Sequence, residues 1–133
     1  MPLRPEQEKL LKDFADNRKH WPAHELDAAI WRIRWALQAL PHQREPEGKE
    51  YDTFLMLAGR GSGKTHTASH WIGIRAWEHP NTRWLVTAPT SNDIRATCFE
   101  GDSGLLNIIP KSLIRDYNKS LFEITLINGS IIQ

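Results

Sequence analysis

The chain lacks several features that mark particular classes of protein. It has a single cysteine, Cys98, which excludes an internal disulfide framework and favours a reducing compartment. No apolar run approaches the ~20 residues of a membrane-spanning helix, and the N-terminus has no apolar stretch of the secretory kind. The 17 basic residues nearly balance the 16 acidic ones, so the net charge of +1 gives no electrostatic footprint for nucleic acid. We therefore expect a cytoplasmic protein without a membrane partner.

The first part of the chain predicts two helices. Residues 5–19 carry a proline in the first turn and a narrow apolar stripe. In the second helix, apolar side chains recur in steps of three and four on one face until Pro41 ends it: Leu26, Ile30, Ile33, Leu37 and Leu40. Trp31 and Trp35 flank this stripe, either as a stacking surface for bases or a partner, or as part of a wide core face. The core interpretation is favoured because aromatic stripes at helical spacing usually belong to a core.

The pattern changes after a polar connector at residues 41–52. The apolar run at 53–58 is typical of a strand that is buried on both faces. A glycine-rich turn follows, and then a helix at 64–77 and a second strand at 83–88. This order predicts a βαβ unit with a right-handed crossover, and therefore an α/β fold with a parallel sheet.

Turn signals dominate the last third of the chain. Thr90 begins a capping box, which predicts the start of another helix. A short helix or turn is expected after that, up to about residue 116. An Asn-Gly pair lies between the apolar segments 121–127 and 130–133, and such a pair predicts a β-hairpin.

The segment with the most chemical information is Ala58-Gly59-Arg60-Gly61-Ser62-Gly63-Lys64-Thr65. It matches the phosphate-binding pattern G-x-x-x-x-G-K-[ST], except that alanine stands at the first position. Glycines let the backbone turn with positive φ, so that successive N–H groups form an anion nest at the amino end of the next helix. A chance Gly-Lys-Thr tripeptide is the alternative. The placement between a predicted strand and a predicted helix favours phosphate binding.

The side chains of this segment have expected roles. Lys64 would reach the β- and γ-phosphates of a nucleotide, and the Thr65 hydroxyl would coordinate Mg²⁺. The glycines make room, and Ser62 contributes its backbone N–H. Arg60 either contacts the γ-phosphate or pairs with a surface carboxylate, and the first role is favoured. The predicted phosphate-binding set is Gly59, Arg60, Gly61, Ser62, Gly63, Lys64 and Thr65, with Arg60 and Lys64 acting on the reacting phosphate.

Further stretches of the sequence add to this motif. They are Trp71-Ile72, the Ala-Pro-Thr turn within residues 84–90, Glu100-Gly101 with residues 103–106, and the hairpin at Asn128-Gly129. Together with residues 53–65 they resemble the N-terminal ATPase of bacteriophage terminase large subunits, the motors that package double-stranded DNA. The resemblance implies an α/β P-loop NTPase fold of the ASCE class, with ATP and Mg²⁺ as cofactors.

The resemblance also implies roles and partners. Lys64 and Thr65 match the family's phosphate and Mg²⁺ ligands, and Arg60 matches an arginine that senses or stabilises the γ-phosphate. Gln43 lies 15 residues before Ala58, where the family often places a glutamine that contacts adenine; a solvated loop residue is the alternative. In the intact motor, hydrolysis would drive double-stranded DNA into the procapsid in the host cytoplasm. The implied partners are DNA, the portal, the small terminase subunit and further copies of the chain.

One part of the family's pattern is missing from the sequence. No apolar strand ends in Asp-Glu to supply a Walker B motif, and Glu123 in the predicted hairpin is a poor substitute. We expect residues 1–50 to be a helical lead-in and connector. Residues 51–133 would be the first part of an ATPase domain, truncated before Walker B, that binds ATP without efficient hydrolysis. Two alternatives stay open: a fragment of a superfamily 2 helicase-like ATPase, and a non-hydrolysing remnant that binds nucleotide or a partner.

Overall fold

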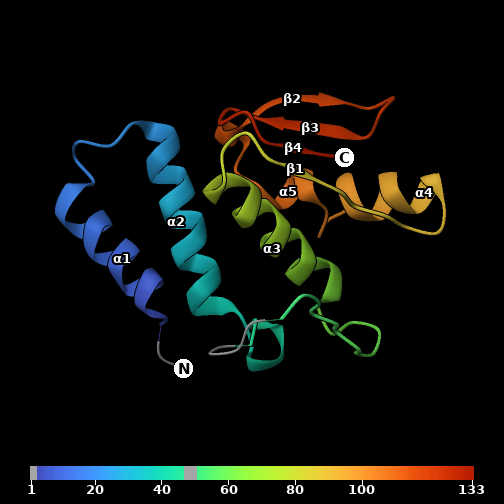
Figure 1. The fold of residues 1–133 in the computed structure, drawn as a ribbon, viewed down its shortest axis with the longest axis horizontal. Helices are drawn as coiled ribbons and strands as arrows, with labels where there is room; N and C mark the ends of the chain where they lie inside the picture. Colours follow the sequence, from blue (N-terminus) through green and yellow to red (C-terminus); the bar gives the residue numbers. More distant parts are fainter. Residues whose placement is uncertain (1–2, 47–50) are drawn as a thin grey trace.

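The structure, a computed structural model, describes residues 3–46 and 51–133. Figure 1 shows the order of its elements along the chain. The helices are α1 (Pro5–Asn17), α2 (Ala23–Gln38), η1 (Pro41–Gln43), α3 (Lys64–Glu78), α4 (Ser91–Asp93), the π-helical η2 (Ile94–Phe99), α5 (Leu105–Ile108) and η3 (Lys111–Leu113). The strands are β1 (Arg83–Trp84), β2 (Ile114–Asn118), β3 (Glu123–Leu126) and β4 (Ile131–Ile132).

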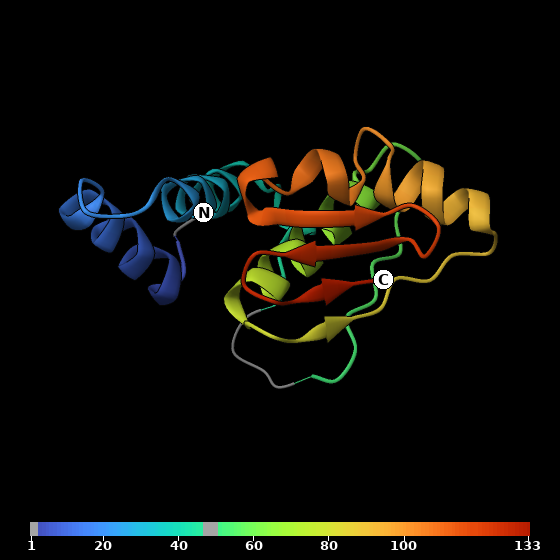
Figure 2. The same cartoon turned by 90° about the horizontal axis from the view of Figure 1, so that it is seen from above.

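The strands form one mixed sheet in the order β1-β4-β3-β2. β1 pairs in parallel with β4, whereas β3 is antiparallel to both of its neighbours. Figure 2 shows the four strands side by side with the helices behind them. α3 contacts β1, η2 and α5 on that covered side. The architecture is therefore a mixed α/β one, with the helices gathered on one face of a small sheet.

The core lies between the sheet and these helices. Its fully buried large side chains come from η2, α5, η3 and the two hairpin strands: Phe99, Leu105, Ile109, Leu113, Ile124, Leu126 and Ile132. Burial of each such side chain stabilises the fold by roughly 1.5–3 kcal/mol. Ala76 and Trp77 join the same cluster from the last turns of α3, and Ala28 and Trp31 join it from α2. The carboxyl-terminal half of α3 is thus fixed in the core, and its amino end projects beyond the sheet (Figure 1).

The strand predicted at residues 53–58 is not present, so the predicted βαβ unit is wrong. This segment has no regular secondary structure and makes no backbone–backbone hydrogen bond with another part of the described chain. Leu55 and Leu57 are 71% and 85% exposed. An apolar run becomes a strand only where a neighbouring strand satisfies its N–H and C=O groups, and none lies beside this segment. The parallel pairing in the sheet instead joins β1 to β4, and the backbone N–H of Val86 continues it by donating to Gln133 O at 2.7 Å.

The second helix forms, but the face it buries is not the predicted one. Ile30, Leu37 and Leu40 are 41%, 64% and 54% exposed. Trp31 is buried in the core, and Trp35 stacks on His70 of α3 with ring centroids 4.0 Å apart. The two indoles offer more apolar area than the leucines do, so the face that carries them is the one packed inward. This confirms the core interpretation of Trp31, whereas Trp35 is half-buried between α2 and α3.

The local predictions of the last third are largely confirmed. The Thr90 hydroxyl accepts a hydrogen bond from the Asp93 N–H at 3.1 Å and caps the helix that follows. The Asn-Gly turn joins β3 and β4 in an antiparallel hairpin. β2, however, occupies Ile114–Asn118, where a helix or turn was expected, because it completes the sheet beside β3. Within the described residues, no helix has both the length and the apolar composition that crossing a bilayer requires.

Candidate phosphate-binding site

The predicted phosphate-binding segment lies where residues 58–63, here called the glycine loop, enter α3. Lys64 is the first residue of α3, and Gly63 is its N-cap. Gly61 and Gly63 have φ values of +80° and +83°, a region that other L-residues enter only with strain. The Ser62 N–H donates to Gly59 O at 3.3 Å and closes a tight turn. Left-handed glycines before the first turn of a helix are a feature of anion-binding loops.

Lys64 folds over this loop. Its Nζ atom donates to Ala58 O at 2.6 Å and to Gly59 O at 2.8 Å, and the side chain stays exposed. Arg60 is also exposed, and its guanidinium makes no ion pair or hydrogen bond with the described residues. An incoming phosphate would replace the two carbonyls as the partner of the Lys64 ammonium group, with Arg60 available as a second cation.

The η1 turn packs against the glycine loop. His42 Nε2 lies 3.0 Å from Ser62 O, which places its N–H on that carbonyl. The amide nitrogen of Gln43 lies 2.6 Å from the point that a Cβ atom on Gly63 would occupy. The Gln43 carbonyl oxygen accepts a hydrogen bond from Leu40 N at 3.0 Å. The structure thus brings Gln43 to the loop, at the end of the site where Lys64 begins the helix.

The loop meets the requirements of a phosphate more fully than those of a divalent cation. A Cβ atom on Gly59 or Gly61 would meet nothing within 4 Å, so space is open there, and the Ser62 hydroxyl is buried without a hydrogen-bond partner. For Mg²⁺, the loop offers the half-buried hydroxyl of Thr65. Across the described ranges, no cluster of three His, Cys, Asp or Glu side chains is placed to hold a metal ion. Mg²⁺ would therefore have to bind together with phosphate oxygens and water.

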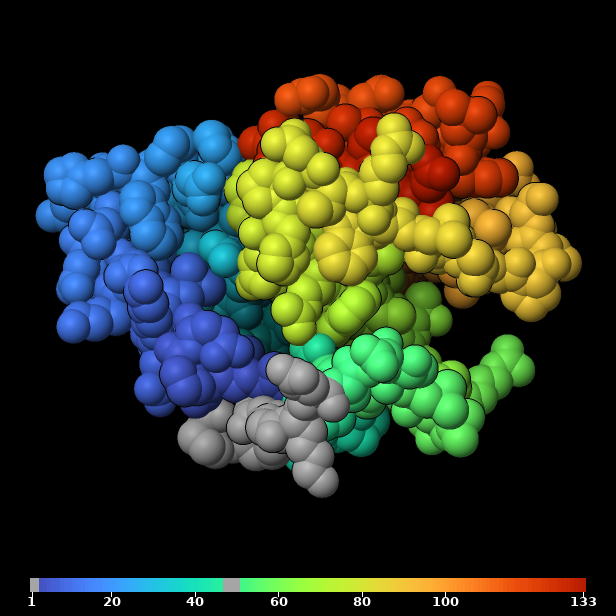
Figure 3. Space-filling model, viewed as in Figure 1, coloured from blue at the N-terminus to red at the C-terminus, as the bar shows by residue number. Residues whose placement is uncertain are grey.

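A groove of about 1370 Å³ runs along the side of α3, starting at Lys64. Its helical wall is Lys64, Thr67, Ala68, Trp71 and Arg75, which share one face of α3. Phe54 and Met56 also line the groove, from the segment before the glycine loop. Figure 3 shows residues 51–58, in green, beside α3 on one face of the molecule. The sequence did not predict this groove, because residues 53–58 were expected to be inside a sheet.

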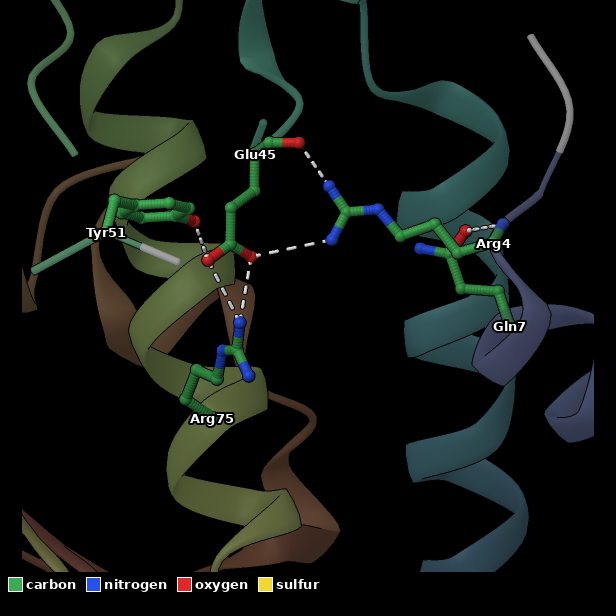
Figure 4. Close-up of polar contacts among 5 residues, drawn as sticks. All are labelled: Arg4, Gln7, Glu45, Tyr51 and Arg75. Carbon is green, nitrogen blue, oxygen red and sulfur yellow. Dashed lines mark hydrogen bonds and ion pairs between the residues drawn. The ribbon is translucent and has the colours of Figure 1, made fainter. Parts of the chain in front are cut away.

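Glu45 is the centre of a cluster of hydrogen bonds and ion pairs at the end of the groove away from Lys64 (Figure 4). Its carboxylate accepts hydrogen bonds from Arg75 Nη2 at 2.9 and 3.0 Å and from the Tyr51 hydroxyl. Arg4 donates to the Glu45 carbonyl and places a guanidinium nitrogen 3.7 Å from the carboxylate. Burial alone would raise the pKa of Glu45, but hydrogen bonds from Tyr51, Trp71 and Arg75 outweigh it and lower this pKa below its ordinary value.

This cluster links parts of the chain that are far apart in sequence. Glu45 is 41 residues from Arg4 and 30 residues from Arg75. Neither a motif nor a periodic pattern connects these three side chains, so no sequence signal pointed to the cluster. Its effect is to fix the start of α1 and the connector against α3.

The opposite side of α3 packs on α2 through aromatic rings. His70 is 7% exposed, and its Nδ1 atom lies 2.9 Å from the His66 carbonyl oxygen. Burial lowers the pKa of His70 from 6.5 to about 4, so the ring that stacks on Trp35 is neutral at pH 7. The glycine loop therefore leads into a helix that is packed on both of its flanks.

Comparison with known proteins adds no further constraint: no protein-family model, curated protein or solved structure matches this chain.

Proposed function

We propose that this chain binds ATP, with Mg²⁺, through the glycine loop and the first residues of α3. The observation that carries the proposal is the position of Lys64. It is the first residue of a 15-residue helix, and it follows Gly61-Ser62-Gly63, in which both glycines are in the left-handed conformation. The ammonium group of Lys64, held on the carbonyls of Ala58 and Gly59, therefore lies beside the loop at the positive end of the helix, where an anion is favoured.

Each residue of the loop has a role in this proposal. Lys64 exchanges its two carbonyl partners for the β- and γ-phosphates, and Arg60 supplies a second positive charge for the γ-phosphate. Ser62 contributes its N–H, and its unpartnered hydroxyl is available as a further polar contact. Thr65 offers its hydroxyl to the Mg²⁺ ion that accompanies the phosphates, an ion that neutralises their charge. Gln43 contacts the nucleotide from η1.

At the level of the whole protein, we propose the N-terminal ATPase portion of a viral DNA-packaging motor, a terminase large subunit. The five sequence stretches that resemble this family support the proposal. Double-stranded DNA, the portal, the small terminase subunit and further copies of the chain would be the partners in the host cytoplasm. The 133 residues contain no Asp-Glu pair to hold Mg²⁺ and activate water. We therefore expect this chain to bind ATP without efficient hydrolysis.

Isothermal titration of the chain with MgATP tests the binding. Lys64→Ala should weaken the affinity at least tenfold, because it removes the cation that meets the phosphates, and should leave the far-ultraviolet circular dichroism spectrum unchanged. Lys111→Ala is the matched control, because Lys111 is an exposed lysine in η3, outside the loop. Equal MgATP affinity in the wild type and in Lys64→Ala would reject the assignment of the loop.

A further inference from the structure

The groove along α3 contains a feature that phosphate binding does not use. We propose that it holds the purine base of the nucleotide, stacked on Trp71, and that the phosphates of the same molecule lie at the glycine loop. This inference rests on the proposed function, because the phosphates fix one end of the ligand. It assigns base recognition to a residue of α3.

The spacing along the helix fits a nucleoside triphosphate. Lys64 and Trp71 lie on the same face of α3 and both line the groove. Seven residues of helix separate them, which is about 10 Å along the axis. That is roughly the distance from the phosphate chain of a nucleotide to its base. Ala68 lies between the two positions and leaves room for a ribose because its side chain is a single methyl group.

The side chains at this position have the chemistry that a base requires. Trp71 and Phe54 both line the groove, one from α3 and one from residues 51–58, and they are 38% and 37% exposed. Aromatic and other apolar side chains with a few polar groups beside them are the usual lining of a small-molecule pocket. Stacking on an aromatic ring is the usual way in which proteins bind a base without hydrogen bonds to its edge.

The surrounding contacts fix Trp71 before a ligand arrives. Trp84 meets the Trp71 ring edge to face, with centroids 5.9 Å apart and planes at 85°. The Arg75 guanidinium carbon lies 5.7 Å from the centre of the same ring, and Glu45 in turn holds Arg75 at 2.9 Å. A ring held on several sides loses little conformational entropy when a base stacks on it. The groove is therefore organised for binding in the state that the structure describes.

The position of Gln43 supports this assignment. Contact with adenine through an amide uses both the oxygen and the nitrogen of that amide. The Gln43 oxygen is already engaged by Leu40 N, and the nitrogen lies against Gly63 at the phosphate end. Base recognition by stacking on Trp71 predicts selection for a purine over a pyrimidine, with ATP and GTP bound about equally.

The test compares two ligands that share their phosphates, MgATP and magnesium tripolyphosphate, by isothermal titration of the full chain. The wild type should bind MgATP about tenfold more tightly than tripolyphosphate. Trp71→Ala should bring the MgATP affinity down to the tripolyphosphate value and leave the tripolyphosphate affinity unchanged. Gln43→Ala should change both affinities in the same proportion, because its amide lies at the phosphate end.

Phe54→Ala should have the same effect as Trp71→Ala, and it serves as the second variant if Trp71→Ala fails to fold. Leu57→Ala is the control, because Leu57 belongs to the same segment, is 85% exposed and does not line the groove. The inference is overturned if wild-type protein binds both ligands equally, or if the tenfold preference survives both aromatic substitutions. Binding of neither ligand by the wild type would instead refute the proposed function itself.

Discussion

The side-chain amide of Asn128 caps the carboxyl end of α3: its nitrogen donates to the carbonyl oxygens of Trp77 at 2.8 Å and of Ala76 at 3.0 Å. Ser130 in the same turn donates its hydroxyl to His79 O at 2.7 Å. The turn between β3 and β4 therefore satisfies carbonyl groups that a helix end leaves without partners. The Asn-Gly pair that predicts a hairpin also fixes the helix that begins at the glycine loop.

Replacing Asn128 by alanine should lower the free energy of unfolding by about 1–2 kcal/mol, because two carbonyl groups in the interior lose their donor. Urea denaturation monitored by tryptophan fluorescence measures the change. Asn92→Ala is the matched control, since the Asn92 side chain is exposed and accepts a single long hydrogen bond, from Arg95 at 3.3 Å, among the residues that the structure describes. Equal losses in the two variants would contradict the role of Asn128 as a cap.

Gly73 sets the distance between α3 and its neighbours. A Cβ atom there would lie 3.0 Å from Ile109 Cγ1 and 3.0 Å from the Trp31 ring. Glycine-to-alanine substitution inside a helix usually stabilises it by about 1 kcal/mol. Here Gly73→Ala should instead destabilise the fold by about 1–2 kcal/mol, because the added methyl group overpacks the core.

A double-mutant cycle checks this explanation by urea denaturation. Ile109→Ala removes one of the two side chains that the new methyl group meets. If overpacking is the cause, the combined variant loses less stability than the sum of the single variants. Strict additivity would show that the effect of Gly73→Ala lies elsewhere.

Glu45 should contribute to stability through its cluster of donors. Glu45→Gln removes the charge that faces Arg75 and Arg4, and we expect a loss of about 1 kcal/mol, since the cluster is only partly shielded from water. Glu78→Gln is the control, because its contact with Arg32 is longer, at 3.8 Å, and its side chain is more exposed than that of Glu45. A larger loss of stability for Glu78→Gln would contradict the expectation that the Glu45 cluster stabilises the fold more than the Glu78–Arg32 pair does. Guanidinium chloride is a salt and would screen these charge interactions, so urea is the suitable denaturant.

His70 makes stability depend on pH. Its pKa is about 4 in the folded chain and 6.5 as a free side chain. Between these two values the unfolded chain binds the proton and the folded chain does not, so the free energy of unfolding falls as the pH drops from 7 to 4. The loss due to His70 should be about 2 kcal/mol, allowing for its partial contact with water.

Urea denaturation at pH 7 and at pH 4.5 measures this loss. His70→Gln should remove most of the difference between the two pH values, because the glutamine has no proton to gain. His20→Gln should keep the wild-type difference, since His20 is an exposed residue in the turn after α1. An unchanged pH difference in His70→Gln would assign the effect to other groups.

The sequence predicted those elements that depend on neighbours in the chain. The capping box at Thr90 and the Asn-Gly turn each involve four residues or fewer, so the local sequence is enough to predict them. The prediction of a strand at 53–58 was wrong because strand pairing depends on a partner that is distant in the sequence, and an apolar run does not specify that partner. The prediction of which face of α2 is buried was wrong for a related reason. Two faces of the helix were apolar, and only contact with His70 and Gly73 on α3 decides which one is buried.

The same distinction between local and distant contacts applies to the candidate site. The glycine loop is contiguous, so residues 58–65 could be named as a unit from their pattern, and the structure places them together at the start of α3. The groove depends on Phe54 and Trp71, which belong to segments whose relative placement no motif encodes. Glu45 was not singled out at all, since its partners are 30 and 41 residues away.

The attachment of α3 at both ends has a mechanical consequence. η1 contacts the loop at the amino end through His42, and Asn128 grips the carboxyl end. Fifteen residues of helix span about 22 Å. A displacement of the glycine loop along the helix axis would therefore be opposed, at the other end of α3, by the hydrogen bonds of Asn128 in the β3–β4 turn.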